Sequence, residues 1–220
     1  MLKNLESIAE PADDEATLWR FMDFTKYVAM LHQRALFFTR ADQLPDPFEG
    51  LYVRRNKVRE SDGLRQRAFL SCWHENEHES AAMWRIYLSS QDGMALRTTA
   101  ARLKRALTDA KETVYLGAVR YLDYQRESIP ARHELDPFFC KRKSFDYERE
   151  VRVLWRADEE LDDPGRYIAA DLETLIEEVV ISPTSEKWFE DLVRSVTEKY
   201  GLELPITTSS LLEPFQSNWM

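Results

Sequence analysis

Short apolar segments recur along this chain at irregular intervals, some with the period of a β-strand and others with the period of a helix. Alternating or β-branched side chains predict strands over residues 17–22, 35–39, 68–73, 94–97, 113–124, 147–155, 179–181 and 205–208. Helical spacing predicts helices over residues 25–34, 79–88, around 103–107 and 185–200. This irregular mixture predicts an α+β domain with a mixed or antiparallel sheet and flanking helices, rather than a doubly wound parallel sheet.

The length of 220 residues fits one domain, because single cores stop growing near ~250 residues. We expect residues 1–16, which are polar and rich in Pro, Asp and Glu, to form a leader before a domain at 17–220. Aromatic residues make up 12% of the chain, enough for a dense core without disulfides or metals. Cys72 and Cys140 belong to no metal-binding or disulfide pattern and are expected to be free thiols.

A net charge of −9 argues against broad binding of nucleic acid, which requires a positive surface. The two basic segments, residues 54–59 and 141–143, are expected to be solvated faces. The start of the chain does not have the pattern of a signal peptide, and no run of about eighteen apolar residues occurs. The sequence therefore predicts a cytoplasmic protein with no membrane partner.

His74-Glu75-Asn76-Glu77-His78 matches the H-E-x-x-H pattern, which in zinc enzymes places two imidazoles on one metal ion. Apolar residues are missing between the two histidines, and no third ligand stands at a recognisable spacing. We therefore expect no metal at His74 and His78, and interpret the segment as a polar helix start.

Asp46-Pro47-Phe48-Glu49-Gly50 predicts a rigid loop, because proline fixes its own φ and restricts the residue before it. Two interpretations of this loop are equally compatible with the sequence. Asp46 and Glu49 either border a substrate cleft, or Asp46 caps a turn while Phe48 packs in the core.

Glu148-x-Glu150-x-Arg152 is the most suggestive group of charges in the sequence. On a strand, residues two apart point to the same side, so the two carboxylates would lie about 7 Å apart. Such a pair either raises one pKa for proton transfer or holds a cation, which Arg152 would supply. The alternative is an exposed strand face with ordinary Glu–Arg pairs.

Several motifs in order along the chain resemble the bacterial domain-of-unknown-function family 2971. They are Leu18-Trp19-Arg20-Phe21, Leu36-Phe37-Phe38-Thr39, Asp46-Pro47-Phe48-Glu49, Phe69-Leu70-Ser71-Cys72-Trp73, Met83-Trp84-Arg85-Ile86-Tyr87, Gly93-Met94-Ala95-Leu96 and Tyr147-Glu148-Arg149-Glu150-Val151-Arg152. The resemblance covers about residues 17–212 and implies a setting in antiphage defence, abortive infection or toxin systems. His74 and His78 depart from the family's pattern.

The order of elements also resembles, more distantly, the ADP-ribosyltransferase fold. That resemblance implies that Arg20 contacts the phosphates of NAD and that Ser71 positions the nicotinamide ribose. It further implies that Glu150 stabilises the oxocarbenium-like ribose, while Glu148 orients or deprotonates the acceptor.

Two other classes of function remain open at the level of sequence. The first is a nonenzymatic sensor or interaction module that binds a nucleotide or a protein partner, such as an antitoxin or defence component, in an aromatic cleft. We expect that cleft to be formed by Trp19, Trp73, Trp84 and Tyr87. The second is a metal-dependent nuclease or phosphohydrolase whose ligands are Asp46, Glu49, Glu148 and Glu150.

Overall fold

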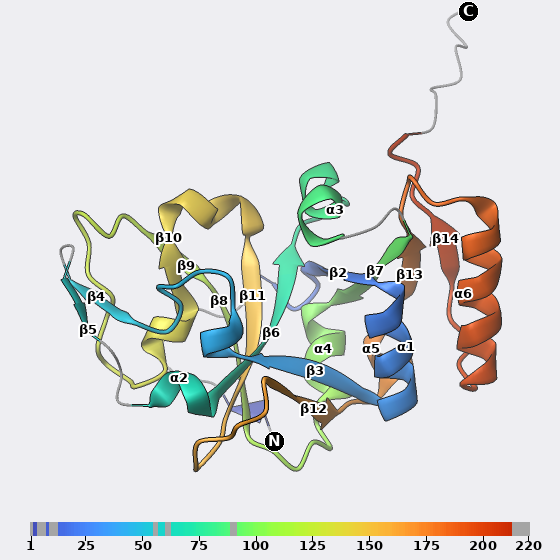
Figure 1. Ribbon diagram of the computed structural model, residues 1–220. Helices are drawn as coiled ribbons and strands as arrows, with labels where there is room; N and C mark the ends of the chain where they lie inside the picture. The colour runs from blue at the N-terminus through green and yellow to red at the C-terminus, as the bar shows by residue number, and fades with distance from the viewer. Residues whose placement is uncertain are drawn as a thin grey trace, which may run out of the picture.

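A computed structural model describes residues 2–3, 8, 13–54, 57–59, 63–88 and 92–212. Most of the predicted leader and residues 213–220 lie outside the described residues. The described part is one α+β domain built around a mixed sheet with flanking helices (Figure 1), which confirms the predicted fold class. No helix in this described part is long and apolar enough to cross a membrane.

The main sheet runs in the spatial order β1-β8-β11-β6-β2-β7-β13-β14, with β3 and β12 attached at β6. Only the β1–β8 and β13–β14 pairs within this sheet are parallel, among the strands described. The strand bounds are β1 Leu2–Lys3, β2 Thr17–Asp23, β3 Ala35–Arg40, β6 Ala68–Glu75, β7 Gly93–Thr99, β8 Val114–Ala118, β11 Glu150–Arg156, β12 Gly165–Ala169, β13 Glu178–Ile181 and β14 Ile206–Thr208.

Strand β6 forms a fork in this sheet. At its start, Phe69 and Leu70 pair with β3, and at its end, His74 and Glu75 pair with β2. Residues 71–73 lie between the two pairings, where β2 and β3 have separated. Helix α1 (Phe24–Gln33) connects β2 to β3, so the chain itself spans the opening of the fork.

Successive side chains of β6 and β11 point to opposite faces of the sheet, and both faces of these central strands are buried. Phe69, Val151 and Val153 belong to the larger core, while Leu70 and Leu154 belong to a second cluster. Helices α1, α4, α5 and α6 pack against the larger core, and α2 against the second. The remaining helix bounds are α2 Leu64–Arg67, α3 Ala81–Tyr87, α4 Ala100–Ala106, α5 Leu172–Leu175 and α6 Lys187–Lys199.

Two predicted strands differ from the structure. The strand predicted over 113–124 is interrupted at Val119, whose amide binds the carbonyl of Glu150. Its second part, β9 (Arg120–Leu122), pairs with β10 (Cys140–Arg142) in a separate small sheet. Strands β4 (Tyr52–Arg54) and β5 (Lys57–Arg59) form another.

The strand predicted over 147–155 begins only at Glu150. Residues Lys143–Glu148 form a 3-10 helix, and Arg149 has a left-handed backbone with φ of 41°. A left-handed residue cannot continue a strand, so the alternating pattern holds only from Glu150 onward. Glu148 and Glu150 therefore come from different elements, contrary to the prediction that they share a strand face.

Candidate functional site

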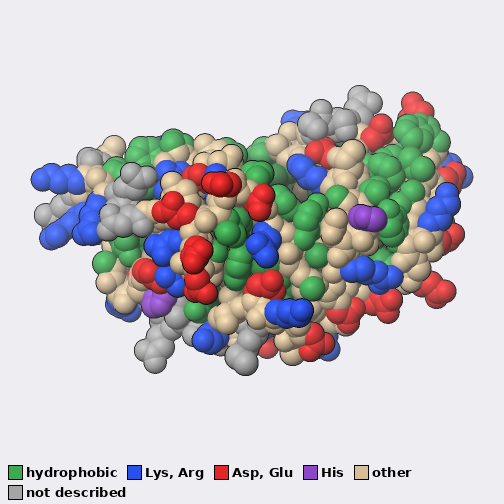
Figure 2. Space-filling view, turned by 60° about the horizontal axis from the view of Figure 1, so that its bottom comes forward, with side chains coloured by type: hydrophobic (Ala, Val, Ile, Leu, Met, Phe, Trp, Pro, Cys, Tyr) green, Lys and Arg blue, Asp and Glu red, His purple; other side chains and the backbone are tan. Residues whose placement is uncertain are grey.

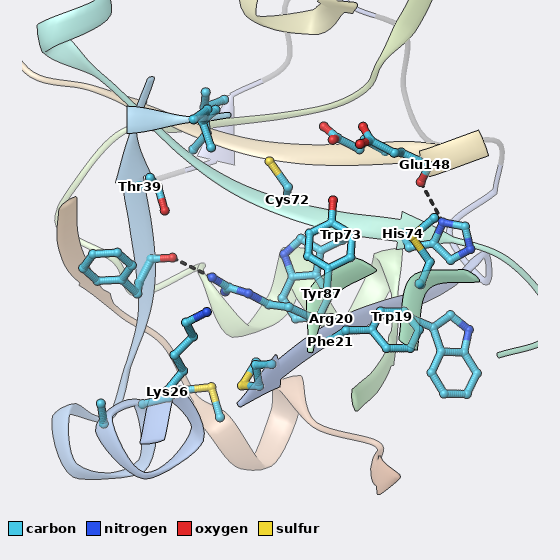
Figure 3. A pocket seen from close by; sticks show the side chains of 18 of the residues that line it. Trp19, Arg20, Phe21, Lys26, Thr39, Cys72, Trp73, His74, Tyr87 and Glu148 are labelled. Carbon is cyan, nitrogen blue, oxygen red and sulfur yellow. Dashed lines mark hydrogen bonds between the residues drawn. The ribbon is translucent and has the colours of Figure 1, made fainter. Parts of the chain in front are cut away.

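A cavity of about 460 Å³ opens where β2 and β3 separate from each other. Strand β6 provides its base through Cys72 and Trp73, and α3 contributes Met83 and Tyr87. The remaining lining residues come mainly from β2, α1 and β3: Trp19, Arg20, Phe21, Met22, Thr25, Lys26, Ala29, Met30, Phe37, Thr39, Leu44, Leu70, His74, Glu148, Glu150 and Tyr167. Figure 3 shows these side chains converging from elements far apart in the sequence.

Arg20 is held at one side of this cavity by neutral groups. Its Nη1 donates to Ser71 Oγ at 2.9 Å and its Nη2 donates to the carbonyl oxygen of Phe37 at 2.8 Å. The guanidinium also lies 5.6 Å from the ring centroid of Trp73. Burial lowers the pKa of Arg20 to about 10, so the group is still a cation at neutral pH. Because its contacts are uncharged, its charge is available to an anion in the cavity.

A second cation lies on the same side. Lys26 is largely exposed and is paired with Asp23 at 3.3 Å. In Figure 3, Lys26 and Arg20 lie together, while Glu148 lies on the opposite side of the cavity. Aromatic side chains, including Trp73 and Tyr87, form the walls between these ends. The cavity thus has a basic end, an acidic end and an aromatic middle.

Glu148 and Glu150 form the acidic end. Glu150 is the first residue of β11, and Glu148 ends the 3-10 helix before it. Both are buried, at 6% and 5% exposure, although they border the cavity. The alternative of an ordinary exposed strand face is therefore wrong.

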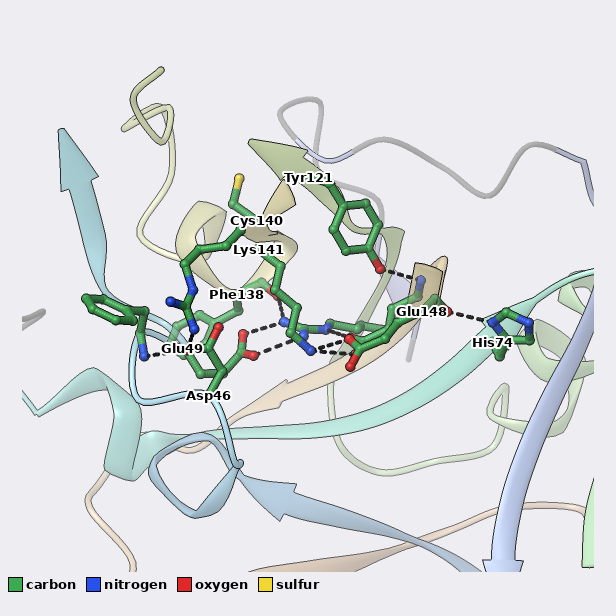
Figure 4. A network of polar contacts seen from close by, with 12 residues as sticks. Asp46, Glu49, His74, Tyr121, Phe138, Cys140, Lys141 and Glu148 are labelled. Carbon is green, nitrogen blue, oxygen red and sulfur yellow. Dashed lines mark hydrogen bonds and ion pairs between the residues drawn. The ribbon is translucent and has the colours of Figure 1, made fainter. Parts of the chain in front are cut away.

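The two glutamates belong to a buried network of charges (Figure 4). Arg152 binds Glu49 through both terminal nitrogens, at 2.5 and 3.0 Å, and Glu150 through Nε at 2.5 Å. Lys141 binds Glu150 at 2.9 Å and also donates to Glu148. Three carboxylates therefore share two cations, and the negative charge exceeds the positive by one when all are ionised.

This imbalance separates the pKa values of the two glutamates. Burial and the neighbouring Glu150 raise the pKa of Glu148 to about 7, although Lys141 opposes the shift. Burial opposes ionisation of Glu150 as well, but Arg152 and Lys141 lower its pKa well below the usual value. A permanently ionised carboxylate and one that titrates near neutral pH thus lie side by side at the cavity.

The Asp46–Gly50 loop supports the network from behind and does not line the cavity. Asp46 accepts hydrogen bonds from the amide of Phe48 at 3.0 Å and from Arg142 at 3.1 Å. Glu49 is fixed by Arg152. Asp46 therefore caps the turn, as one of the two interpretations predicted. Phe48 does not pack in the core: the guanidinium carbon of Arg142 lies over its ring, 4.8 Å from the ring centroid.

The segment at His74 and His78 is not a helix. His74 and Glu75 end strand β6, and His78 lies exposed in a bend after it. Nδ1 of His74 contacts the carbonyl oxygen of Glu148 at 2.6 Å, so the ring supports the backbone before β11. No cluster of three metal-ligating side chains occurs within the ranges that the structure describes. The carboxylates proposed for a nuclease, Asp46, Glu49, Glu148 and Glu150, instead bind Arg142, Arg152 and Lys141.

Of the residues singled out from the sequence, Arg20, Tyr87, Glu148 and Glu150 line one cavity. Ser71 and Trp84 do not. Ser71 is fully buried and accepts hydrogen bonds from Arg20 and Trp73, so it positions Arg20 and cannot touch a ligand.

Trp84 lies behind Phe21, with the two ring centroids 4.9 Å apart. The aromatic lining therefore includes Trp19, Trp73 and Tyr87 but lacks the fourth predicted member. Arg152, with 0% exposure, lies behind Glu150 instead of facing the cavity.

Sequence reasoning missed two lysines of the site. Lys141 was placed on a solvated basic face, but its side chain is 9% exposed and binds both glutamates. Lys26 belongs to none of the motifs recognised in the sequence. Lys141 directly follows the buried Phe138-Phe139-Cys140 segment, but an apolar neighbour does not by itself indicate that a lysine ammonium is buried, so the sequence carried no signal for it.

The chain matches no family model, so the resemblance to family 2971 is not confirmed, and it matches no curated protein sequence. Among solved structures, it is similar to DarT from Thermus sp. 2.9 in complex with NAD+. That match has a TM-score of 0.47 and 10% identity, and it covers 91% of this chain and 98% of the other. The same protein in complex with ADP-ribosylated ssDNA gives a TM-score of 0.46 and 11% identity, covering 91% and 96%.

Proposed function

We propose that this protein is an ADP-ribosyltransferase that uses NAD as its substrate. The observation that carries the proposal is one cavity that holds the guanidinium of Arg20 at one end and Glu148 with Glu150 at the other. NAD has the matching distribution of groups: two phosphates, two ring systems and a ribose that becomes cationic during transfer.

The basic end supports binding of the pyrophosphate. A guanidinium held by Ser71 and Phe37 is already oriented, so little side-chain entropy is lost when it binds phosphate oxygens. Lys26 adds a flexible second cation on the same side. The walls formed by Trp73 and Tyr87 suit the stacking of flat rings.

The acidic end supports the chemical step. When the bond between nicotinamide and ribose breaks, positive charge develops on the ribose, and the ionised Glu150 stabilises it. The acceptor's nucleophilic atom then forms a bond to the same ribose carbon, and its proton passes to Glu148. A carboxylate with a pKa of about 7 is well matched to accept that proton at neutral pH.

The direct test is release of nicotinamide from NAD by the purified protein, together with a mass-spectrometric search for ADP-ribose on acceptors. Glu150→Gln removes the charge while keeping the shape of the side chain, and we expect it to abolish turnover. Glu198→Gln alters an exposed glutamate far along the chain, in α6, and serves as the matched control. Turnover unchanged in Glu150→Gln would contradict the role of this residue, provided that both variants fold.

A second candidate function is a nonenzymatic nucleotide sensor. It is favoured by one observation: Glu150 is already bound by two cations, Lys141 and Arg152, as a structural carboxylate would be. A sensor is stabilised by nucleotide without consuming it, whereas an enzyme consumes NAD. Thermal-shift measurements with NAD, followed by analysis of the remaining NAD, separate the two.

We place this activity in a bacterial toxin or antiphage defence system, in the cytoplasm, where a protein partner such as an antitoxin would restrain it. This setting rests on the order of motifs in the sequence, which no family model matches, and two free thiols are compatible with a reducing compartment. Induced expression should arrest growth of the host, and Glu150→Gln should relieve the arrest. Equal arrest by both forms would separate toxicity from the proposed chemistry.

A further inference from the structure

Lys141 is the contact that the two glutamates of the cavity have in common. Its Nζ lies 2.9 Å from Oε1 of Glu150 and also donates to Oε2 of Glu148, and the side chain is 9% exposed. The ammonium lies 4.8 Å from the centroid of the Phe145 ring, which covers it. The lysine itself is not among the residues that line the cavity, so a ligand would meet the carboxylates and not the ammonium.

The contacts of the two carboxylates are unequal. Glu150 binds both Lys141 and Arg152, while Glu148 shares Lys141 and binds no second cation among the described residues. Arg152 is in turn engaged with Glu49 through both of its terminal nitrogens. If one proton enters the cluster, it costs least to place it on Glu148, because Glu150 would lose two attractive contacts.

We propose that Lys141 is a positioning residue that holds Glu148 beside Glu150 and sets how readily Glu148 gains and loses a proton, while Arg152 keeps Glu150 as a carboxylate. One ammonium is sufficient to hold both acids close together, but it is insufficient to keep both ionised. The consequence for catalysis rests on the proposed function, whereas the distribution of the proton does not.

Among the other titratable or charged groups described around this cluster, none forms an ion pair with Glu148. Strand β6 presents Cys72 and His74, α3 presents Tyr87, β9 presents Tyr121, and the network behind contains Glu49 and Arg152. Burial raises the pKa of the Cys72 thiol to about 12 and lowers that of His74 below its usual value, so both are neutral at neutral pH. Glu49 and Arg152 form an ion pair with each other.

The test begins with proton binding in the protein without ligand. Carboxyl carbons of glutamate are followed by NMR against pH, with Glu148→Gln and Glu150→Gln to assign the two resonances. In the wild type, Glu148 should titrate near neutral pH. In Lys141→Gln its midpoint should rise by about one pH unit or more, because loss of a nearby cation disfavours the carboxylate. In Lys141→Arg, which keeps the charge, the midpoint should stay near the wild-type value.

A midpoint that does not move in Lys141→Gln would overturn the proposal. If Lys141→Gln does not fold, the nitrogen resonance of the Lys141 ammonium in the wild type gives the same information. It should shift with pH at the midpoint of Glu148, and a resonance that stays constant through this range would also overturn it.

Turnover of NAD then tests the catalytic consequence. A rise of one unit in the midpoint of the general base lowers the ionised fraction at pH 6 about tenfold and leaves it nearly unchanged at pH 9. We therefore expect kcat/KM of Lys141→Gln to fall about tenfold at pH 6 and to recover at pH 9, with Lys141→Arg following the wild-type profile.

An equal loss of kcat/KM at both pH values would reduce Lys141 to a purely structural role and contradict the proposal. If no form of the protein turns over NAD, the proposed function fails. The NMR result still decides whether Lys141 sets the titration of Glu148.

Discussion

Arg152 offers the strongest test of how this domain holds together. Its side chain is 1% exposed and binds Glu49, Glu150 and the carbonyl oxygen of Phe138. In Arg152→Met, the apolar part of the side chain is retained, but two buried carboxylates lose a cation. Removal of one partner from a buried ion pair costs about 3–5 kcal/mol in free energy of unfolding. For a chain of this length, that corresponds to a fall in Tm of roughly 6–20 °C.

Urea unfolding followed by tryptophan fluorescence measures this loss. Arg126→Met is the matched control, because Arg126 is 87% exposed and lies 3.6 Å from Asp123, where an ion pair contributes at most about 1 kcal/mol. A loss below about 1 kcal/mol in Arg152→Met would refute the reasoning. A double variant with Glu49→Met should be more stable than the sum of the single losses predicts, because it removes the stranded charge together with its partner.

The pH dependence of the same variant has a definite sign. Without Arg152, the folded-state pKa values of Glu49 and Glu150 rise above their unfolded values, so the folded state binds protons more readily than the unfolded state. The deficit in stability should therefore be largest above neutral pH and should shrink as the pH falls through those raised values. A deficit that is constant from pH 4 to pH 8 would show that lost packing, rather than uncompensated charge, is the cause.

Three further predictions test the cavity and its surroundings. Arg20→Gln should weaken binding of ADP about tenfold or more in calorimetry but leave adenosine unaffected, since charge-assisted bonds to phosphate contribute ~1.5–3 kcal/mol; equal losses for both ligands would contradict phosphate binding at Arg20. Cys72 lines the cavity, but burial raises the pKa of its thiol to about 12, so it should react with iodoacetamide at pH 7.5 far more slowly in the folded protein than in urea; fast labelling would contradict the raised pKa. Gly50→Ala should cost about 1–3 kcal/mol in urea unfolding, because Gly50 has φ of 71° and a Cβ there would lie 2.2 Å from the ring of Phe138; a neutral effect would mean that the ring moves aside.

The sequence predicted most of the individual elements, because local periodicity reflects burial directly. Strands β2, β3, β6 and β7 and helices α1 and α6 lie close to their predicted positions. The short strands β4, β5 and β12 were missed because each has a single β-branched residue and an arginine, unlike the equally short β13 and β14, which are mostly β-branched. The break at Arg149 was missed for another reason: nothing in Tyr147-Glu148-Arg149-Glu150 indicates a left-handed residue at the third position.

The site depends on pairings that local pattern does not contain. Arg20 and Glu150 line opposite ends of one cavity, and Ser71 binds Arg20 from outside it; the sequence offered only a resemblance in strand order as a guide to this arrangement. The fork at β6 could not be deduced, because it depends on long-range pairing: the start of β6 pairs with β3 and its end pairs with β2. Lys141 and Glu49 were misplaced because the sequence does not reveal that a charged side chain is buried when its partners are distant in the chain.

The composition of the network argues that it is retained for more than stability. Replacing a buried ion network by apolar residues of similar volume is often neutral or stabilising, so folding alone does not require three carboxylates and two cations beside a cavity. An odd carboxylate is the costly element of such a network, and here Glu148, which has fewer cation contacts than Glu150, lies at the cavity. Glu49 and Arg152 alone would anchor the Asp46–Gly50 loop to β11. The addition of Lys141, Glu148 and Glu150 has a different result: it places a group that titrates near neutral pH next to a permanent negative charge, at a surface that a ligand can reach.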